Sequence, residues 1–274
     1  MLICIEGIDG SGKSTQAKLL ADSIQGAVLL KFPAYETPVG QAIQSYLRGE
    51  VGWMLRDPQS PMILRVESDL SPDEILAATE YLKRVSSARG FIVLEPDASI
   101  EQAGVAPSQA EPLALQALMT LNRLELVPTI RAHLSAGRTV VLDRYWPSGV
   151  AYGAADGLDA TWLEMVHELL PQPDLMLLVD LDPKLSVERR PERADAYEAD
   201  QGRLERAHHA YMKLWQSHCL DGRWHIIEGD APLEQVQRSI WNYVDAYVLD
   251  HGETIVWKFS SKISTDDLCQ RILR

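Results

Sequence analysis

The chain has 274 residues, 46% of them hydrophobic, and a formal net charge of −13 at pH 7. This length supports one large hydrophobic core with at most a small additional unit. The acidic balance argues against a nucleic-acid surface, which needs clustered positive charge, and no apolar run approaches the ~20 residues of a membrane span.

The cysteines and the first residues indicate the compartment. Cys4, Cys219 and Cys269 are far apart in the sequence and lack metal-ligand spacing, so we expect free thiols and a reducing, cytoplasmic environment. We expect no cleaved signal peptide, because no basic segment precedes the first apolar residues.

The chain begins with an apolar run at residues 2–5, a glycine loop at 7–14 and an amphipathic helix at 16–24. The loop Gly7-Ile8-Asp9-Gly10-Ser11-Gly12-Lys13-Ser14 fits G-x-x-x-x-G-K-[ST], and a strand before it and a helix after it are the context in which this pattern binds phosphate. Backbone N–H groups and the helix N-terminus would hold the phosphates, Lys13 would contact the β- and γ-phosphates, and Ser14 would ligate Mg²⁺. The predicted nucleoside triphosphate site comprises Gly7, Asp9, Gly10, Ser11, Gly12, Lys13, Ser14 and Thr15.

Short apolar strands alternate with helical segments along most of the remaining chain. Strands are predicted at 27–32, 139–142, 175–181 and 224–227. Helices are predicted at about 38–48, 112–135 with a kink at Pro128, 159–169, 183–190, 199–218 and 232–249. This alternation predicts an α/β fold, a P-loop NTPase three-layer sandwich with a five-stranded parallel sheet, whose ligands gather at the carboxyl ends of the strands.

Two segments fall outside this alternation, the insertion at 51–111 and the tail at 251–274. The insertion contains predicted strands at 62–67 and 91–95 with a helix between them, and the tail contains one at 254–259. A two-stranded sheet with one helix is marginal alone. We therefore expect a main domain from 1–50 and 112–250, and a small α+β satellite in which the tail strand pairs with the insertion.

Charged residues follow two of the predicted strands. Asp143 and Arg144 come directly after the strand at 139–142. An Asp there can bind Mg²⁺ and an Arg can bind a second phosphate; the alternative is an ion pair on the surface. The strand at 175–181 leads to Arg189, Arg190 and Arg193, which suit a mobile lid over phosphates or else a solvated helix end. Other candidates are weaker: Glu6 and Asp180 could approach the metal or pair structurally, and His167-Glu168 lacks the second histidine of a zinc helix.

In this order the motifs resemble the thymidylate kinases, a family of P-loop nucleoside monophosphate kinases. The resemblance covers about 1–50 and 113–250. It rests on the P-loop with Asp9, Phe32-Pro33, Asn122-Arg123, Asp143-Arg144-Tyr145, Ala196-Tyr197-Glu198 and Gly229-Asp230-Ala231-Pro232. It implies transfer of the ATP γ-phosphoryl group to dTMP with Mg²⁺, in a homodimer without nucleic-acid or membrane partners.

The resemblance also implies roles for individual residues. Asp9 would hold the deoxyribose 3′-hydroxyl, Arg144 the acceptor monophosphate and Arg123 the carbonyl edge of the base, while Tyr152 would fill the place of a ribose 2′-hydroxyl. The catalytic residues implied are Lys13, Arg144, Arg189, Arg190 and Arg193, with Ser14 and Asp143 at the metal and Ala231 near the adenine. The implied acceptor site is Asp9, Phe32, Tyr35, Met119, Arg123, Arg144, Ser148, Tyr152 and Tyr197.

The chain departs from the family pattern at three places. Gly10 stands where some members carry a P-loop arginine, so the transition-state arginine should come from the lid. Met119 stands where an aromatic usually stacks on thymine, a contact worth ~1–3 kcal/mol that the polarisable thioether recovers only in part. After Phe32-Pro33 the chain has Ala34-Tyr35, which removes an arginine that many relatives carry.

Several alternative functions remain open at this point. A kinase for another or a modified deoxynucleotide would fit Met119. A deoxynucleoside kinase would not need Arg144, and a switch GTPase would need an N-K-x-D motif that is not found here. A regulatory protein that binds nucleotide without turnover is disfavoured by the intact Lys13, Ser14 and Asp143.

Overall fold

The computed structural model describes residues 1–47, 107–189 and 200–258. Its centre is a single parallel sheet with the strand order β2-β3-β1-β4-β5. The strands are β1 (Leu2–Glu6), β2 (Val28–Lys31), β3 (Val140–Asp143), β4 (Leu175–Asp180) and β5 (Trp224–Glu228). The five-stranded parallel sheet predicted from the sequence is confirmed, and each strand lies within two residues of its predicted bounds.

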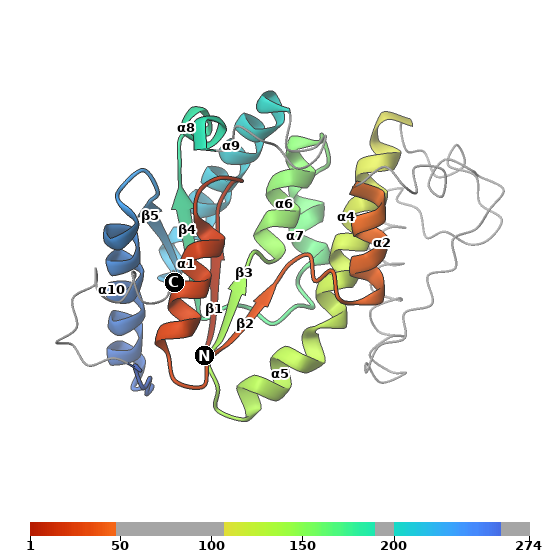
Figure 1. Ribbon diagram of the computed structural model, residues 1–274. Coiled ribbons are helices and arrows are strands. Elements are labelled where there is room, and N and C mark those ends of the chain that lie inside the picture. Colours follow the sequence, from red (N-terminus) through yellow and green to blue (C-terminus); the bar gives the residue numbers. More distant parts are fainter. Residues whose placement is uncertain (48–106, 190–199, 259–274) are drawn as a thin grey trace.

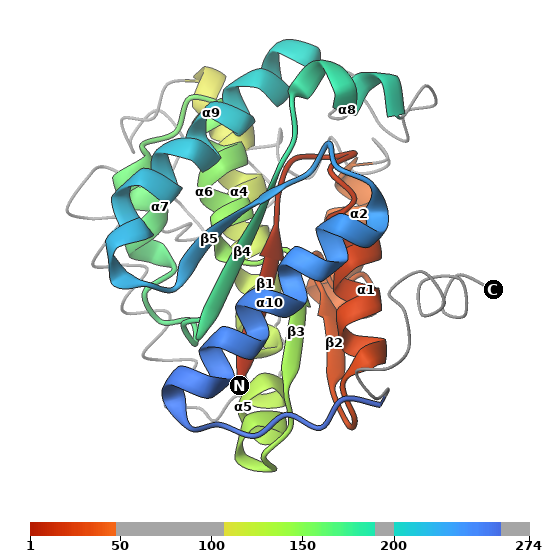
Figure 2. The same cartoon turned by 90° about the vertical axis from the view of Figure 1, so that its left-hand side faces the viewer.

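Helices cover both faces of the sheet, which gives three layers (Figures 1 and 2). On one face, α1 (Lys13–Ser23) and α10 (Leu233–His251) pack on alternate strand residues such as Ile3, Ile5 and Val141. The opposite strand residues, such as Cys4 and Leu142, face the other helices. Those are α4 (Pro107–Glu125), α5 (Val127–Ser135), α6 (Trp146–Ala155), α7 (Ala160–Val166) and α9 (Gln201–His218).

Two further α-helices lie in the described part of the chain. Helix α2 (Pro38–Leu47) packs its Val39 and Ile43 against Leu115 and Leu118 of α4. Helix α8 (Pro183–Arg189) follows β4. Within the described residues, no helix is both long and apolar enough to cross a membrane.

The single kinked helix predicted at 112–135 is wrong, because the structure has two helices there. Helix α4 ends at Glu125 and α5 begins at Val127, with Leu126 as its N-cap and Pro128 in its first turn. The first turn of a helix has no intrahelical partner for its N–H groups, so proline is tolerated there. Pro128 therefore starts a new helix and does not bend an existing one.

Helix α6 was not predicted. Most of its residues are buried, and a helix that is buried all round shows no amphipathic period. Its N-terminus is capped by Glu6 of β1, whose Oε1 accepts hydrogen bonds from the amides of Tyr145 at 2.6 Å and Ser148 at 3.2 Å. A cap so distant in sequence leaves no local signal.

The described tail residues lie against the turn between α1 and β2. Trp257 forms an isolated antiparallel bridge with Ile24, flanked by hydrogen bonds from Gln25 N to Val256 O at 2.7 Å and from Lys258 N to Ser23 O at 2.8 Å. In the described residues 254–258, the predicted tail strand is therefore reduced to this one bridge with the α1–β2 turn. The insertion strands expected as its partners lie outside the described residues, and the satellite unit stays a prediction.

Candidate active site

The glycine loop between β1 and α1 is closely packed against neighbouring backbone. A Cβ at Gly7, where φ is +147°, would lie 2.6 Å from the carbonyl oxygen of Val179 in β4. At Gly10, where φ is +77°, it would lie 2.8 Å from Ser186 Oγ of α8. Positive φ and close contact together restrict these positions to glycine, so a P-loop arginine in place of Gly10 would not fit here.

The N-terminus of α1 has the properties of an anion site. The helix begins at Lys13, and no side chain caps it, so its first-turn N–H groups can face an anion. Lys13 is 5% exposed, and its Nζ donates to Ile8 O at 3.1 Å and lies 3.5 Å from Asp9 Oδ1. Burial, helped by the charge of Arg144, lowers the pKa of Lys13 from 10.5 to about 8. A phosphate placed here would favour the charged form again.

Asp143 ends β3 with a buried carboxylate. Its Oδ1 has no hydrogen-bond partner among the residues that the structure describes, and an unpaired buried carboxylate oxygen is costly unless a cation meets it. Ser14 lies in the first turn of α1. No group of three or more His, Cys, Asp or Glu forms a metal cluster in the described ranges. Mg²⁺ needs none, because it is usually held by one or two carboxylates plus substrate phosphates.

Glu6 and Asp180, which the sequence left as possible metal neighbours, have structural partners. Besides capping α6, Glu6 accepts hydrogen bonds at Oε2 from the hydroxyls of Ser148 and Tyr211, both at 2.8 Å. Asp180 Oδ1 lies 2.7 Å from His208 Nε2 of α9. Both carboxylates therefore join the sheet to the helices that surround the cavity.

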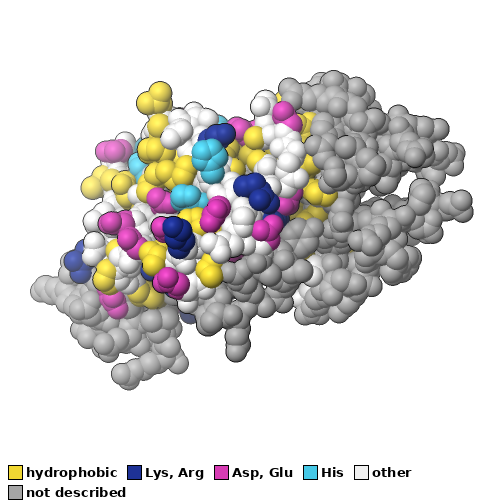
Figure 3. Space-filling view, turned by 90° about the horizontal axis from the view of Figure 1, so that it is seen from above, with side chains coloured by type: hydrophobic (Ala, Val, Ile, Leu, Met, Phe, Trp, Pro, Cys, Tyr) yellow, Lys and Arg dark blue, Asp and Glu magenta, His cyan; other side chains and the backbone are white. Residues whose placement is uncertain are grey.

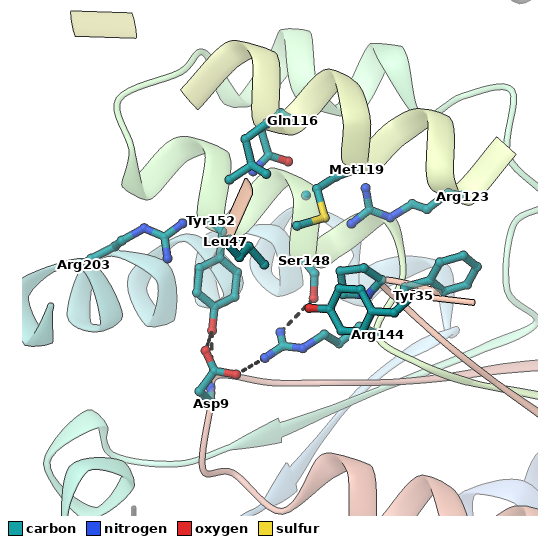
Figure 4. A pocket seen from close by; sticks show the side chains of 14 residues that line it. Asp9, Tyr35, Leu47, Gln116, Met119, Arg123, Arg144, Ser148, Tyr152 and Arg203 are labelled. Atoms are coloured by element: carbon teal, nitrogen blue, oxygen red, sulfur yellow. Dashed lines mark hydrogen bonds and ion pairs between the residues drawn. The ribbon is translucent and has the colours of Figure 1, made fainter. Parts of the chain in front are cut away.

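A cavity opens beside the P-loop, between α2, α4, α6 and the start of α9 (Figure 4). Eight of the nine residues predicted for the acceptor site line it; the ninth, Tyr197, lies outside the described residues. The lining consists of Asp9, Phe32, Pro33, Tyr35, Leu47, Leu115, Gln116, Met119, Arg123, Arg144, Ser148, Gly149, Tyr152 and Arg203. From the side of the strand carboxyl ends, basic, acidic and histidine side chains lie close together on this face of the molecule (Figure 3).

Asp9 connects the P-loop to this cavity. Its Oδ1 forms an ion pair with Arg144 Nη2, and its Oδ2 accepts a hydrogen bond from the Tyr152 hydroxyl at 2.7 Å (Figure 4). Arg144 Nη1 in turn donates to Ser148 Oγ at 3.1 Å. Arg144 has a φ of 66°, which is uncommon for a non-glycine residue and is often found at functional sites.

The inner wall of the cavity is formed by α4 and the loop after β2. Arg123 is 3% exposed, and burial lowers its pKa to about 10; Met119 lies one helical turn before it. Asn122 fixes the loop, because its Oδ1 accepts from Ala34 N at 2.8 Å and its Nδ2 donates to Thr37 Oγ1 at 2.8 Å. The peptide bond between Phe32 and Pro33, at the start of this loop, is cis.

Comparison with known proteins identifies the fold and its family. The family model described as thymidylate kinase matches residues 5–54 and 97–240. The chain belongs to the thymidylate kinase family. A probable thymidylate kinase of Pyrococcus horikoshii is 32% identical over 218 residues, covering 77% of this chain and 81% of that protein.

Further relatives cover more of the chain. The human thymidylate kinase is 26% identical over 244 residues, 87% of each chain. The solved structure of the Candida albicans thymidylate kinase has the same fold, with a TM-score of 0.61, 24% identity and coverage of 93% of this chain and 94% of that one. This chain, as a member of this family, is therefore an ATP-dependent nucleoside monophosphate kinase, as the resemblance predicted.

Helix α8, which leads into the predicted lid, contacts the loop at 229–232 that is predicted to lie near the adenine. Arg189 Nη1 donates to the carbonyl oxygen of Gly229 at 3.0 Å, so α8 is tied to the loop that carries Ala231. Ala231 is partly buried against the α1–α10 side of the core. Arg190 and Arg193 lie outside the described residues, and the choice among the three arginines stays a prediction.

Arg203 of α9 also lines the cavity of this kinase, although it was not predicted from the sequence. Its Nε and Nη2 donate to the two carboxylate oxygens of Asp156 at 2.6 and 2.8 Å, and its guanidinium carbon lies 5.0 Å from the ring centre of Tyr152. Gln116, Gly149 and Leu47 were missed as well. None carries a local motif, because their place at the cavity depends on how α2, α4, α6 and α9 pack together.

Proposed function

We propose that this kinase transfers the γ-phosphoryl group of ATP to dTMP, giving ADP and dTDP, at the cavity beside the P-loop. One observation carries the proposal: the Asp9 carboxylate lies within 3.5 Å of Lys13 Nζ and also bonds Arg144 and Tyr152 of the cavity. A triphosphate at Lys13 and a monophosphate at Arg144 would therefore be neighbours. Phosphoryl transfer depends mainly on this kind of positioning and on charge neutralisation.

On the donor side, the P-loop backbone from Gly7 to Thr15 would surround the phosphates. Lys13 would neutralise charge on the β- and γ-phosphates, and its burial strengthens this interaction. One of Arg189, Arg190 and Arg193 would add positive charge when the lid closes. An acceptor phosphate oxygen would then attack the γ-phosphorus in line, without a covalent enzyme intermediate.

On the acceptor side, Arg144 would bind the monophosphate and Arg123 the carbonyl edge of the base. Asp9 would accept a hydrogen bond from the 3′-hydroxyl. Tyr152, held by its own hydrogen bond to Asp9 at 2.7 Å, would exclude a 2′-hydroxyl. Met119 lines the same cavity, where it can contact the face of the base.

The residues present fit Mg²⁺ as the cofactor. Asp143, through its unpartnered buried oxygen, and Ser14, in the first turn of α1, would hold the ion or its waters. The ion would neutralise negative charge on the triphosphate. Removal of divalent cations with EDTA should abolish turnover and Mg²⁺ should restore it; turnover that continues at full rate in EDTA would contradict the assignment.

We also propose a cytoplasmic homodimer. Cys4 and Cys219, the two cysteines in the described part of the chain, are free, which supports a reducing compartment. Family membership favours the dimer. Sedimentation velocity tests the assembly, and a monomer at micromolar concentration would contradict it.

The sugar assignment has a direct test. Asp9→Asn keeps the size of the side chain and removes its charge, so the KM for dTMP should rise about tenfold with the loss of a charged hydrogen bond. The KM for 3′-deoxy-dTMP should rise by a smaller factor, because that analogue has no hydroxyl to bind and feels only the weakened contact of Asp9 with Arg144. Asp22→Asn is the matched control, since Asp22 is exposed on α1 and pairs with Lys18 at 2.6 Å. An equal loss with both nucleotides would contradict the role of Asp9 at the sugar.

A further inference from the structure

His167 lies behind the base-reading end of the cavity. It is 1% exposed, directly after α7, and its Nε2 lies 3.4 Å from Arg123 Nη1. This is at the long end of the hydrogen-bonding range. Among the described residues, no Asp, Glu, Lys or other Arg side chain forms a hydrogen bond with Arg123 or with His167.

The hydrogen bonds around the ring fix its tautomer. His167 Nδ1 lies 2.6 Å from the carbonyl oxygen of Leu163, and a carbonyl can only accept, so Nδ1 carries the proton. Burial and the neighbouring positive charge of Arg123 hold the pKa of His167 well below 6.5. The ring is therefore neutral at pH 7, and Nε2 presents a lone pair.

That lone pair is available to Arg123. The other group near Nε2 is the Thr120 hydroxyl, at 3.2 Å. Thr120 Oγ1 also lies 2.8 Å from the carbonyl oxygen of Gln116, to which its single proton can be donated. Nε2 can then accept from Arg123 Nη1, while Arg123 Nε has no partner in the described part of the chain.

A glycine in α6 makes this arrangement possible. A Cβ at Gly149 would lie 2.8 Å from His167 Cε1 and 3.1 Å from Arg123 Nη1. Any larger residue would therefore press on the two groups where they meet. Gly149 also lines the acceptor cavity together with Arg123.

We propose that His167 is a positioning residue, whose neutral imidazole holds the Arg123 guanidinium by Nη1 so that its remaining N–H groups face the carbonyl edge of the acceptor base. The proposal rests on the proposed function, in which Arg123 reads the base. His167 does not touch the nucleotide, so its effect passes through Arg123. A neutral acceptor serves this purpose because it orients the guanidinium without cancelling its charge.

The test compares two variants of the same residue. His167→Asn keeps an amide N–H near the place of Nδ1, but its side chain is too short to reach Arg123. His167→Gln extends an amide oxygen toward the place of Nε2. Each is assayed with dTMP and with the analogue whose base is 5-methylpyrimidin-2-one, which lacks the 4-carbonyl oxygen.

We expect His167→Asn to raise the KM for dTMP about tenfold, the effect of one hydrogen bond to a charged group, with kcat nearly unchanged. The KM for the pyrimidin-2-one analogue should stay within about twofold of wild type, and His167→Gln should recover most of the affinity for dTMP. An equal rise in KM for both nucleotides, or no rise for either, would overturn the proposal. Equal KM values for the Asn and Gln variants would overturn it as well.

Two further measurements separate the possible failures. Arg123→Met alone tests the base-reading role: if it leaves the preference for dTMP over the analogue intact, the assignment of Arg123 fails. If Arg123→Met removes the preference and His167→Asn does not change it, only the His167 proposal fails. In the Arg123→Met background, His167→Asn should have no added effect on KM. His218→Asn, at the far end of α9, is the control for the chemical change, and thermal unfolding of each variant checks the fold.

Discussion

The Glu6 carboxylate accepts two hydrogen bonds from Ser148, one from the amide at 3.2 Å and one from the hydroxyl at 2.8 Å. Ser148 in turn accepts a hydrogen bond from Arg144 at 3.1 Å. A buried residue of β1 therefore positions the N-terminus of α6 and, through it, the arginine proposed to bind the acceptor phosphate.

Glu6→Gln should destabilise the protein. The NH₂ group of the glutamine would take the place of a carboxylate oxygen that now accepts hydrogen bonds, so it would face N–H or O–H donors and leave them without an acceptor. One buried unsatisfied group costs about 1–3 kcal/mol. We expect urea denaturation to report a fall of about 2 kcal/mol in the free energy of unfolding. Glu228→Gln, an exposed residue at the end of β5, should leave it unchanged. Equal stabilities of the two variants would contradict the structural role of Glu6.

Lys13→Ala should lower kcat at least ~10²-fold, the scale of one preorganised electrostatic contact. The fold should remain, because the substitution removes charge at the phosphates and not core packing. Lys18→Ala, on the exposed side of the same helix, is the control. A Lys13→Ala variant with near-normal kcat and only weaker ATP binding would contradict the role assigned to Lys13.

Protonation of Lys13 should be coupled to ATP binding. Without phosphate, burial and Arg144 lower the pKa of Lys13 from 10.5 to about 8, so the amine is mostly neutral at pH 9. Bound triphosphate favours the ammonium and raises that pKa again, so binding at pH 9 should take up a proton. Calorimetry in buffers of different ionisation enthalpy measures this uptake, which should be small at pH 7 and lost in Lys13→Met. No uptake in the wild-type protein at pH 9 would contradict the prediction.

The same pKa shift gives a pH dependence of stability. Between pH 8 and 10.5 the unfolded chain binds a proton at Lys13 that the folded chain has lost. The Lys13 contribution to the free energy of unfolding should therefore increase as the pH rises through this window. The difference in the free energy of unfolding between wild type and Lys13→Met, measured from pH 7.5 to 10, isolates the Lys13 contribution. If the wild type loses stability relative to Lys13→Met as the pH rises, the prediction is contradicted.

Arg144 and the lid arginines should differ kinetically. Loss of Arg144 should raise the KM for dTMP strongly, because it is proposed to bind the phosphate in the ground state. Loss of the lid arginine that acts should lower kcat more than it raises KM, since its partner charge develops in the transition state. Unchanged kcat in single substitutions at Arg189, Arg190 and Arg193 would rule out the lid assignment.

Met119→Phe should tighten dTMP binding by up to ~1 kcal/mol, because base–aromatic stacking replaces a thioether contact. Met119→Leu, which adds no aromatic face, should not. Titration calorimetry with dTMP gives both Kd values. If the Phe and Leu variants bind alike, Met119 does not contact the face of the base.

Local sequence patterns were sufficient to predict the central sheet and several residues of the candidate site. The P-loop has a contiguous motif, and strands buried on both faces are continuous apolar runs, so the sheet and Lys13 could be predicted. Asp143 and Arg144 could be found because they lie at the carboxyl end of a strand. Helix α6 could not, since burial on all sides removed its amphipathic period and its cap, Glu6, comes from β1.

Residues that act through packing between distant helices also escaped prediction. Arg203 reaches the cavity because Asp156 and Tyr152 of the α6 region hold it, and His167 meets Arg123 because Gly149 leaves room. The pairing of Trp257 with Ile24 likewise depends on the position of the α1–β2 turn. In each case the sequence shows the residue but not its partner.

The most direct test of the central claim is the rate of ADP formation with Mg-ATP and each of the deoxynucleoside and ribonucleoside monophosphates in turn. We predict the highest kcat/KM with dTMP, lower values with other deoxynucleotides, and little activity with ribonucleotides in the wild-type protein, which Tyr152→Ala should relax. A protein that ignores dTMP and phosphorylates a purine deoxynucleotide would contradict the account.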